Sequence, residues 1–354
     1  MLTSLHEAEQ VATEWDVPTE DVLLITLNHC GLSNDGLGQR TRIVLTMQTR
    51  PDDQIHLILS LRRPDSPFAI RDGLVTLGDE PFARIDRLDA DDAVLGYWRN
   101  GARVLTLNSN ARSQCVGCAF CPNTLEDAAD PALRSAPDLA AYFAAVSAGQ
   151  GGDMSGVDRI TVCTGCFRFE PLALEHLTRV RGLMHAHACA GVLHFLSSVL
   201  ETDEGLVAAA ELGPFHLTLT AECFTGRRAI LKESKARLTP DDMESVLSRA
   251  KAAGLMTDFT YIVGLDSYSD AARGLERLAE HSTTFPRVQV YQAHTSLMDV
   301  YLQPEARHIG YYLKLRKWLE ELFGPSGLRP KPWENYRSLW YFQFGREPLL
   351  GARI

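Results

Sequence analysis

The sequence predicts an α/β fold built on a parallel sheet that helices cover. From about residue 101 onward, apolar runs of strand length alternate with segments of helical period, giving about six β/α units. Strands that alternate with helices at this rate pair in parallel, because each helix carries the chain back along the sheet. The 354 residues are 45% hydrophobic and 23% charged, which excludes disordered, collagen-like and low-complexity scaffolds.

The strands of these units are short runs rich in Val, Ile, Leu, Thr and Phe. They are expected at residues 102–107, 159–163, 191–196, 215–220, 257–263 and 288–291. Helices are expected between them at residues 137–148, 171–185, 203–212 and 269–281. A further helix opens at Thr239, which can cap it, continues through Pro240 in its first turn, and stops at Gly254. Functional residues are expected at the carboxyl ends of the strands.

The N-terminal part of the chain has a different hydrophobic pattern, and residues 1–98 are predicted to form a β-rich unit. A helix is indicated only at about residues 4–15. The apolar runs Val22–Leu27, Arg42–Met47 and Ile55–Leu61 are short and separated by Asp, Pro and Gly, as strands are. This unit is consistent either with a surface that binds a leader peptide or with a lid over the α/β part.

Two further segments complete the predicted organisation. Residues 99–300 form the α/β core, and residues 301–354 form an extension that begins as a helix and then becomes aromatic. The aromatic side chains of the extension are Trp333, Tyr336, Trp340, Tyr341, Phe342 and Phe344. They are expected to pack over the open side of the α/β core, and plain core packing explains them equally well.

Charge and hydropathy exclude several classes of protein. The formal net charge is −10 and the chain has no run of Lys or Arg, which argues against nucleic-acid and anionic-membrane partners. No stretch approaches 18 consecutive apolar residues, so no membrane span is expected. Residues 1–7 lack the basic and apolar regions of a signal peptide, so the expected location is the cytoplasm, where thiols stay reduced.

The strongest chemical signal is a group of cysteines after the first strand of the α/β core. Three of the eight cysteines, Cys115, Cys118 and Cys121, fall within seven positions as C-x-x-C-x-x-C. In a reduced compartment such spacing indicates metal ligands. A structural zinc site usually has four protein ligands. An iron–sulfur cluster held by three cysteines leaves one iron open. A zinc site with a distant fourth ligand and buried, unconnected thiols are the alternatives.

The chain resembles the radical S-adenosylmethionine (radical SAM) superfamily over roughly residues 101–295. The resemblance lies in the order and spacing of several segments. The first is the cysteine loop, with Phe120 before its last cysteine and Pro122-Asn123 after it. Strand two is followed by Thr164-Gly165-Cys166, and strand four by Ala221-Glu222 and then Arg227, Arg228, Lys232 and Lys235. Strand five contains Tyr261–Asp266, and strand six contains Val288–Gln292. The chain departs from the usual C-x-x-x-C-x-x-C, since Gln114 stands at the expected first cysteine.

The resemblance implies a partial (β/α)6 TIM-like barrel. It also implies that Cys115, Cys118 and Cys121 hold a [4Fe-4S] cluster whose open iron binds S-adenosylmethionine. The remaining cofactor-binding residues that it implies are Phe120, Thr164, Gly165, Cys166, Glu222, Arg227, Arg228, Gly264, Leu265 and Tyr291. Among them, Glu222 would bind the ribose hydroxyls or the ammonium group. Arg227 or Arg228 would pair with the methionine carboxylate, as a planar two-pronged donor suits that group.

Five further residues keep more than one interpretation. Cys163 and Cys166 form a second C-x-x-C, and they are packed side chains, a hydrogen-atom or thiol donor to a substrate radical, or ligands of a second cluster. Cys166 is the candidate catalytic residue. His194 and His216 lie on predicted strands, so they either face a substrate cavity or are satisfied core histidines; His294, just after the sixth strand, has the same alternatives.

The function that follows from the resemblance is reductive cleavage of S-adenosylmethionine to a 5′-deoxyadenosyl radical, which abstracts hydrogen from a substrate. A small molecule, such as an amino acid, a sugar or a secondary metabolite, is the first expectation, and a peptide or protein is the second. An electron donor such as flavodoxin or ferredoxin is the expected partner. The rival class is a zinc-stabilised binding protein without enzymatic activity, and an electron carrier is a third.

Overall fold

The structure is a computed structural model. It describes residues 2–34, 40–61, 63–90, 96–108, 117–121, 133, 135–163, 167–351 and 353. The chain divides into two compact units, each described by itself below. Unit 1 comprises residues 1–92, 261–276 and 287–354, and unit 2 comprises residues 93–260 and 277–286.

A seven-stranded sheet forms the half-barrel, with strand order β12-β11-β10-β9-β8-β7-β6. Its strands are β6 (Gly96–Arg99), β7 (Val104–Asn108), β8 (Arg159–Cys163), β9 (Val192–Ser197), β10 (Phe215–Glu222), β11 (Met256–Val263) and β12 (Arg287–Val290). Strands β7 to β10 pair in parallel, whereas β6 joins the edge antiparallel to β7. The six strands expected from the sequence are all present. The predicted α/β fold, a partial barrel with a β-rich N-terminal part, is thereby confirmed.

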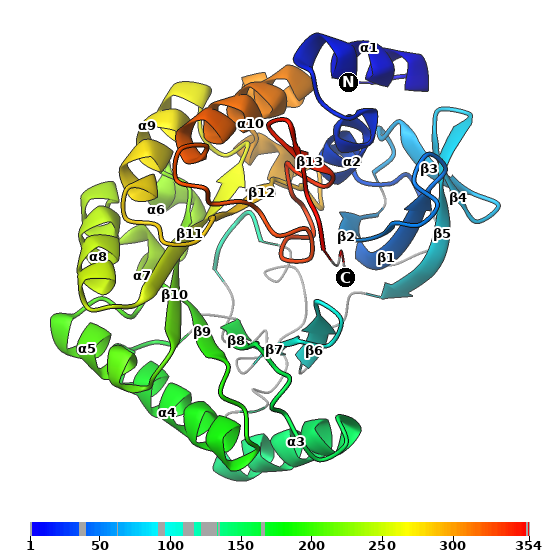
Figure 1. Cartoon of the computed structure of the whole chain (residues 1–354). Coiled ribbons are helices and arrows are strands. Elements are labelled where there is room, and N and C mark those ends of the chain that lie inside the picture. Colours follow the sequence, from blue (N-terminus) through cyan, green and yellow to red (C-terminus); the bar gives the residue numbers. More distant parts are fainter. Residues whose placement is uncertain are drawn as a thin grey trace. The chain divides into compact units, whose positions relative to one another are not determined.

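Helices follow the strands of unit 2 as the hydrophobic periodicity predicts. They are α3 (Ala136–Gly149), α4 (Glu170–Ala186), α5 (Asp203–Glu211), the short α6 (Arg227–Ile230) and α7 (Glu233–Ala236), and α8 (Pro240–Ala252). Figure 1 shows α3, α4, α5 and α8 along one side of the strands. The predicted start of α8 is confirmed as a capping box, in which Thr239 accepts from the backbone N–H of Asp242 and Asp242 accepts from that of Thr239.

Strand β10 shows how the sheet of unit 2 divides into two faces. Successive side chains of a strand point to opposite sides. One side of β10 is apolar, with Phe215, Leu217, Leu219 and Ala221, and α8 packs against this strand. The other side is polar, with His216, Thr218, Thr220 and Glu222, and all eight residues are buried. The polar face of the sheet is therefore buried too, and its side chains need partners.

Unit 1 contains a five-stranded sheet with strand order β2-β1-β5-β4-β3 (Figure 1). Its strands are β1 (Arg40–Met47), β2 (Gln54–Ser60), β3 (Phe68–Arg71), β4 (Leu74–Leu77) and β5 (Glu80–Ala90). The pairs β1–β2, β1–β5, β3–β4 and β4–β5 are antiparallel. The expected strands at 42–47 and 55–61 and the helix at about 4–15, which is α1 (Leu5–Trp15), are confirmed.

The prediction of a strand at Val22–Leu27 is wrong. These residues lie inside helix α2 (Thr19–Cys30), and each of them is buried. A helix that is surrounded by protein has no polar face, so it lacks the 3.6-residue pattern that identifies a surface helix. A short apolar run of this kind is compatible with a buried strand and with a buried helix.

The rest of unit 1 contains α9 (Tyr268–Ala279) in part, α10 (Ile309–Phe323) and the aromatic segment after it. Short 3-10 helices, η3 (Met298–Tyr301) and η4 (Pro304–Arg307), precede α10. Within the aromatic segment Trp340, Tyr341, Phe342 and Phe344 are buried. The segment ends in a small hairpin of β13 (Gln343–Phe344) and β14 (Glu347–Pro348). The expectation that this extension closes the barrel stays a prediction, as do the boundaries at 98 and 300.

Candidate functional site

The described part of the cysteine loop, residues 117–121, is held against the turn between α6 and α7. The backbone N–H of Ala119 donates to the carbonyl of Ile230 at 2.8 Å. The backbone N–H of Lys232 points at Cys118 Sγ, 3.5 Å away. Gly117 has a φ of +100°, and a Cβ added to it would lie 3.2 Å from that of Lys232. The close approach and the positive φ both require glycine here.

This docking brings the loop after β7 to the elements that follow β10, in agreement with the expectation that both lie at the carboxyl ends of the strands. Cys118 is 8% exposed and Phe120 is equally buried. Cys121 is partly exposed, and its backbone N–H donates to the carbonyl of Cys118 at 3.0 Å. A single turn of chain therefore carries both thiols.

The surroundings of Cys118 act on its thiol in opposite directions. Burial, the largest effect, raises the pKa of the Cys118 thiol because the thiolate loses its hydration. The ammonium of Lys235 and the Lys232 N–H lower that pKa, whereas the carboxylate of Glu222 raises it. Cys118 is therefore buried and feels a lysine and a glutamate whose charges act on its thiol in opposite directions.

Glu222 ends β10 and forms an ion pair with Lys235, whose side chain is nearly as buried (12% and 13% exposed). The φ of Glu222 is +67°, a left-handed conformation that costs a residue with a Cβ about 1–2 kcal/mol. Such strain persists only where the surroundings impose it, and it gathers at functional sites. The surroundings therefore hold this strand end in an unfavourable conformation.

Arg227 fixes the backbone around Glu222. Its guanidinium donates to the carbonyls of Ala221 and Cys223, and to that of Lys235 at 2.6 Å. The Arg227 side chain is buried, whereas Arg228 is exposed. In this structure Arg227 ties the end of β10 to α7, and the assignment of either arginine to a methionine carboxylate stays a prediction.

Three predicted cofactor residues belong to unit 1. Gly264 follows β11 with a φ of +114°, and Leu265 beside it is 2% exposed. Tyr291 follows β12; its N–H donates to the carbonyl of Val263 and its hydroxyl to that of Met298, both at 2.8 Å. Gly264 and Tyr291 thus lie side by side. The predicted contact of Gly264 and Leu265 with adenine stays a prediction.

Four predicted residues lie outside the described part of the chain: Cys115, Thr164, Gly165 and Cys166. The complete three-cysteine set therefore stays a prediction. Among the described residues, no group of three or more Cys, His, Asp or Glu side chains lies within metal-binding distance. The pair that is described suits an iron–sulfur cluster in its chemistry, since it offers two thiols, a backbone N–H aimed at one sulfur and a neighbouring cation.

A polar network that the sequence does not predict lies on the buried polar face of the unit 2 sheet. His194 on β9 and His216 on β10 are in register, and their rings stack with centroids 4.3 Å apart. His194 bonds Thr161 through Nδ1 at 3.0 Å and Thr218 through Nε2 at 2.8 Å. Both histidines are therefore satisfied core residues, which was one of the two interpretations.

Asp258 on β11 is the centre of this network and is 1% exposed. It accepts from the Thr218 hydroxyl, from Thr284 at 2.8 Å, and lies 3.1 Å from His216 Nε2. A buried carboxylate needs several donors, and β10 and the segment just before β12 supply them here. The signal in the sequence was the polar residue at every second position of β10.

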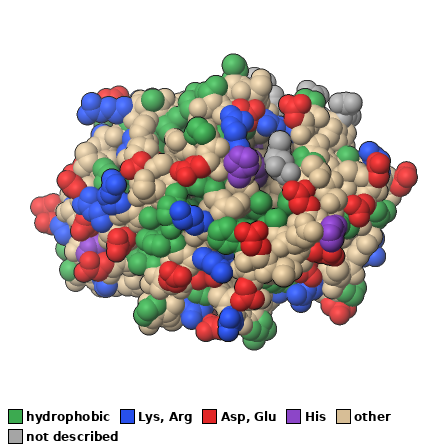
Figure 2. All heavy atoms as spheres, turned by 90° about the horizontal axis from the view of Figure 1, so that it is seen from above, with side chains coloured by type: hydrophobic (Ala, Val, Ile, Leu, Met, Phe, Trp, Pro, Cys, Tyr) green, Lys and Arg blue, Asp and Glu red, His purple; other side chains and the backbone are tan. Residues whose placement is uncertain are grey.

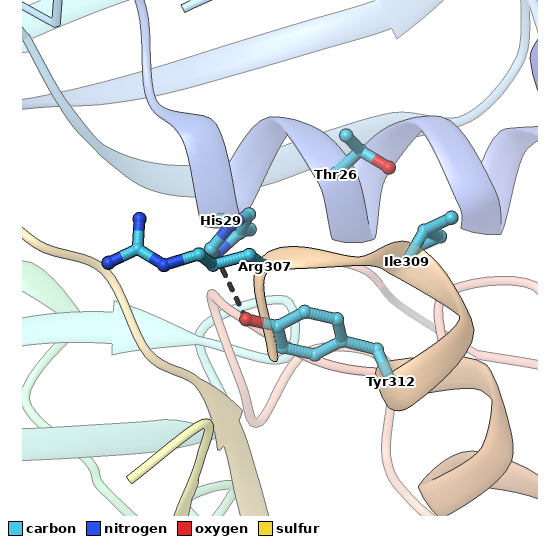
Figure 3. Close-up of a pocket in the computed structure, with 5 residues that line it drawn as sticks. All are labelled: Thr26, His29, Arg307, Ile309 and Tyr312. Atoms are coloured by element: carbon cyan, nitrogen blue, oxygen red, sulfur yellow. Dashed lines mark hydrogen bonds between the residues drawn. The ribbon is translucent and has the colours of Figure 1, made fainter. Parts of the chain in front are cut away.

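A cavity in unit 1 lies between α2, η4 and α10 and contains about 220 Å³ of space, open solvent included (Figure 3). It is lined by Thr26, His29, Arg307, Ile309 and Tyr312. The Tyr312 hydroxyl and His29 Nδ1 are 2.9 Å apart. Burial lowers the pKa of His29 to about 4, so the ring is neutral at pH 7. The part of this space that a water-sized sphere can occupy is about 10 Å³, which is room for about one water molecule and too little for a small-molecule ligand.

On the surface, acidic and basic side chains are interspersed over the face that Figure 2 presents. In the described parts of the chain, no helix combines the length and the hydropathy needed to cross a membrane.

No model of a known protein family matches the chain, and no curated protein matches it significantly. Solved structures do match. SuiB of Streptococcus suis, in a crystal structure with bound S-adenosylmethionine, aligns with a TM-score of 0.40 and 10% identity over 59% of this chain and 45% of SuiB. A second crystal structure of SuiB aligns with the same TM-score and identity over 63% of this chain and 46% of SuiB. The chain thus spans less than half the length of SuiB in either alignment.

Proposed function

We propose that the protein is a radical SAM enzyme that abstracts a hydrogen atom from a small-molecule substrate. The observation that carries the proposal is the position of the C-x-x-C-x-x-C motif. It follows the first parallel strand of a half-barrel, and Cys118 and Ala119 are bonded to the turn between α6 and α7, after β10. The carboxyl ends of barrel strands are where such folds carry out chemistry.

In this proposal Cys115, Cys118 and Cys121 hold a [4Fe-4S] cluster, and Cys166 is the candidate hydrogen or thiol donor to the substrate radical. The cluster and S-adenosylmethionine supply one-electron cleavage of the sulfonium, which generates the 5′-deoxyadenosyl radical. The electron comes from a donor such as flavodoxin or ferredoxin.

The chain's own residues orient and shield this chemistry. Glu222, held by Lys235 on a strained strand end, would accept hydrogen bonds from the hydroxyls or the ammonium of S-adenosylmethionine. Arg227 keeps that strand end in place through three carbonyls. Phe120, two residues after Cys118 and equally buried, would help to exclude water from the sulfur ligands.

Anaerobic purification tests the cofactor part of the proposal. A brown protein that contains iron and sulfide, and that releases 5′-deoxyadenosine from S-adenosylmethionine and dithionite, supports it. A colourless protein with stoichiometric zinc contradicts it and leaves the zinc-stabilised binding protein.

The substrate part needs a separate measurement, because the cofactor assay is the same for every radical SAM substrate. Candidate amino acids, sugars and peptides are incubated in deuterated form, and transfer of deuterium into 5′-deoxyadenosine identifies the substrate. Transfer from a peptide alone, with binding lost when residues 1–98 are deleted, favours peptide modification over a small molecule.

A further inference from the structure

The Glu222–Lys235 ion pair lies beside the cysteine loop, and the sequence predicts no function for its lysine. Both side chains are mostly buried, and the ammonium and the carboxylate are in direct contact. Lys232 donates its N–H to Cys118 Sγ at 3.5 Å, and Lys235 lies one turn further along the same segment. The pair is therefore part of the immediate surroundings of a sulfur ligand.

Four hydrogen bonds fix the place of this pair relative to the sulfur. Arg227 donates to the Lys235 carbonyl at 2.6 Å and to the carbonyls on either side of Glu222. The cysteine loop is bonded to the same segment through Ala119 and Ile230 at 2.8 Å. The two charges are thus held by backbone contacts on both sides and are not mobile surface groups.

Charges act strongly here because they are poorly solvated. Two unit charges a few ångströms apart interact several times more strongly at the effective dielectric constant of a protein interior than in water. Both Lys235 and Glu222 act electrostatically on Cys118, with opposite signs. Removing either member of the pair therefore leaves the other as an uncompensated charge next to the cysteine site.

We infer that Lys235 and Glu222 are positioning residues that set the reduction potential of the cluster held at Cys118. This inference rests on the proposed function. Reduction adds one electron to the cluster, so a nearby positive charge favours the reduced form and a negative charge opposes it. In the native pair the two effects largely cancel, so each charge offsets the shift that the other alone would cause, while Glu222 stays fixed in its strained conformation.

The test is a redox titration of the reconstituted full-length protein, with dithionite as reductant and the signal of the reduced cluster as readout. Lys235→Met is expected to lower the midpoint potential, because it removes a positive charge and leaves Glu222 unpaired. Glu222→Gln is expected to raise it for the opposite reason. The double variant is expected to return close to the native value.

Two controls separate charge from structure. Lys235→Arg keeps the positive charge and is expected to keep the potential. Lys251→Met removes a lysine on α8 that bonds the carbonyl of Glu280, away from the cysteine loop, and is expected to change nothing. Circular dichroism of each variant confirms that the chain has folded.

The outcomes distinguish failure of the proposed function from failure of the role inferred for the Glu222–Lys235 pair. A native protein that takes up no cluster refutes the proposed function. A native protein with a cluster whose potential is the same in Lys235→Met and Glu222→Gln, or shifts in the same direction in both, overturns the inference alone. Loss of the cluster from every variant of the pair, Lys235→Arg included, also overturns it, since the pair is then structural.

Discussion

Asp21 and Arg316 form an ion pair in which neither side chain has any exposed surface, with Oδ2 and Nη1 2.6 Å apart. It joins α2 to α10. Asp21 Oδ1 accepts the backbone N–H groups of Tyr341 and Phe342 at 3.1 and 3.0 Å, and Arg316 donates to the Leu339 carbonyl at 3.0 Å. The pair thereby binds the aromatic segment to two helices of unit 1.

Arg316→Met is expected to destabilise the protein by roughly 3–5 kcal/mol, because it leaves the carboxylate of Asp21 buried and uncompensated. Denaturant unfolding measures this. Arg346→Met is the control, since its pair with Asp16 is 3.5 Å long and exposed, and such pairs are worth about 0–1 kcal/mol. Equal effects of the two substitutions would contradict a central role for the Asp21–Arg316 pair.

His29 predicts a dependence of stability on pH. Burial lowers its pKa to about 4, below the ordinary 6.5, so the unfolded chain binds more protons between these values. Stability is therefore complete above about pH 6.5 and falls as the pH drops toward 4, by about 2 kcal/mol at pH 5. His29→Gln is expected to remove this part of the pH dependence in thermal unfolding, whereas His6→Gln, at a side chain that is 77% exposed, leaves it.

Gly264→Ala is expected to destabilise unit 1 by about 1–3 kcal/mol. The φ of +114° is unfavourable for any residue with a Cβ, and the added carbon would lie 3.1 Å from Leu302 Cδ1 and 3.3 Å from Tyr291 Cβ. Gly310→Ala is the matched control in α10. Its Cβ would meet only Trp15 at 3.8 Å, so alanine should stabilise the helix by about 0.5–1 kcal/mol. Unfolding midpoints that fall for both variants would contradict the argument.

Asp258→Ala is expected to destabilise unit 2 by about 3–5 kcal/mol, because it leaves the buried polar groups of His216, Thr218 and Thr284 without their shared acceptor. Asp241→Ala removes a carboxylate that is 84% exposed and is expected to cost less than about 1 kcal/mol. Urea titrations measure the free energy of unfolding of both variants. A loss for Asp258→Ala no larger than that for Asp241→Ala would show that the fold does not need the network.

Cys118→Ala is expected to abolish cluster incorporation and the formation of 5′-deoxyadenosine, since it removes one of three sulfur ligands. Iron and sulfide analysis together with product chromatography measure both. Cys189→Ala removes another buried thiol of unit 2, 3.7 Å from the Val157 carbonyl, and is expected to leave both properties unchanged. Cleavage of S-adenosylmethionine by the Cys118→Ala protein would exclude the proposed mechanism.

Much of the fold follows from local pattern. Alternating strands and helices between β7 and β12 each carry their own periodicity, and Thr239 and Asp242 specify the start of α8 within four residues. The pattern fails at α2, where burial on every side removes the polar face that marks a helix. The sequence gives no sign of the role of Asp21 in that helix, because its partner is an arginine 295 residues away.

The sequence by itself determined the order of the β/α units and the three-cysteine motif, because both are local properties of a few consecutive residues. Tertiary structure decided which of these residues meet. Cys118 receives a hydrogen bond from Lys232, 114 residues further on. Glu222, at the end of β10, forms an ion pair with Lys235 in α7. Such contacts form only when parallel strands bring their carboxyl ends to one edge, so no pattern along the chain encodes them.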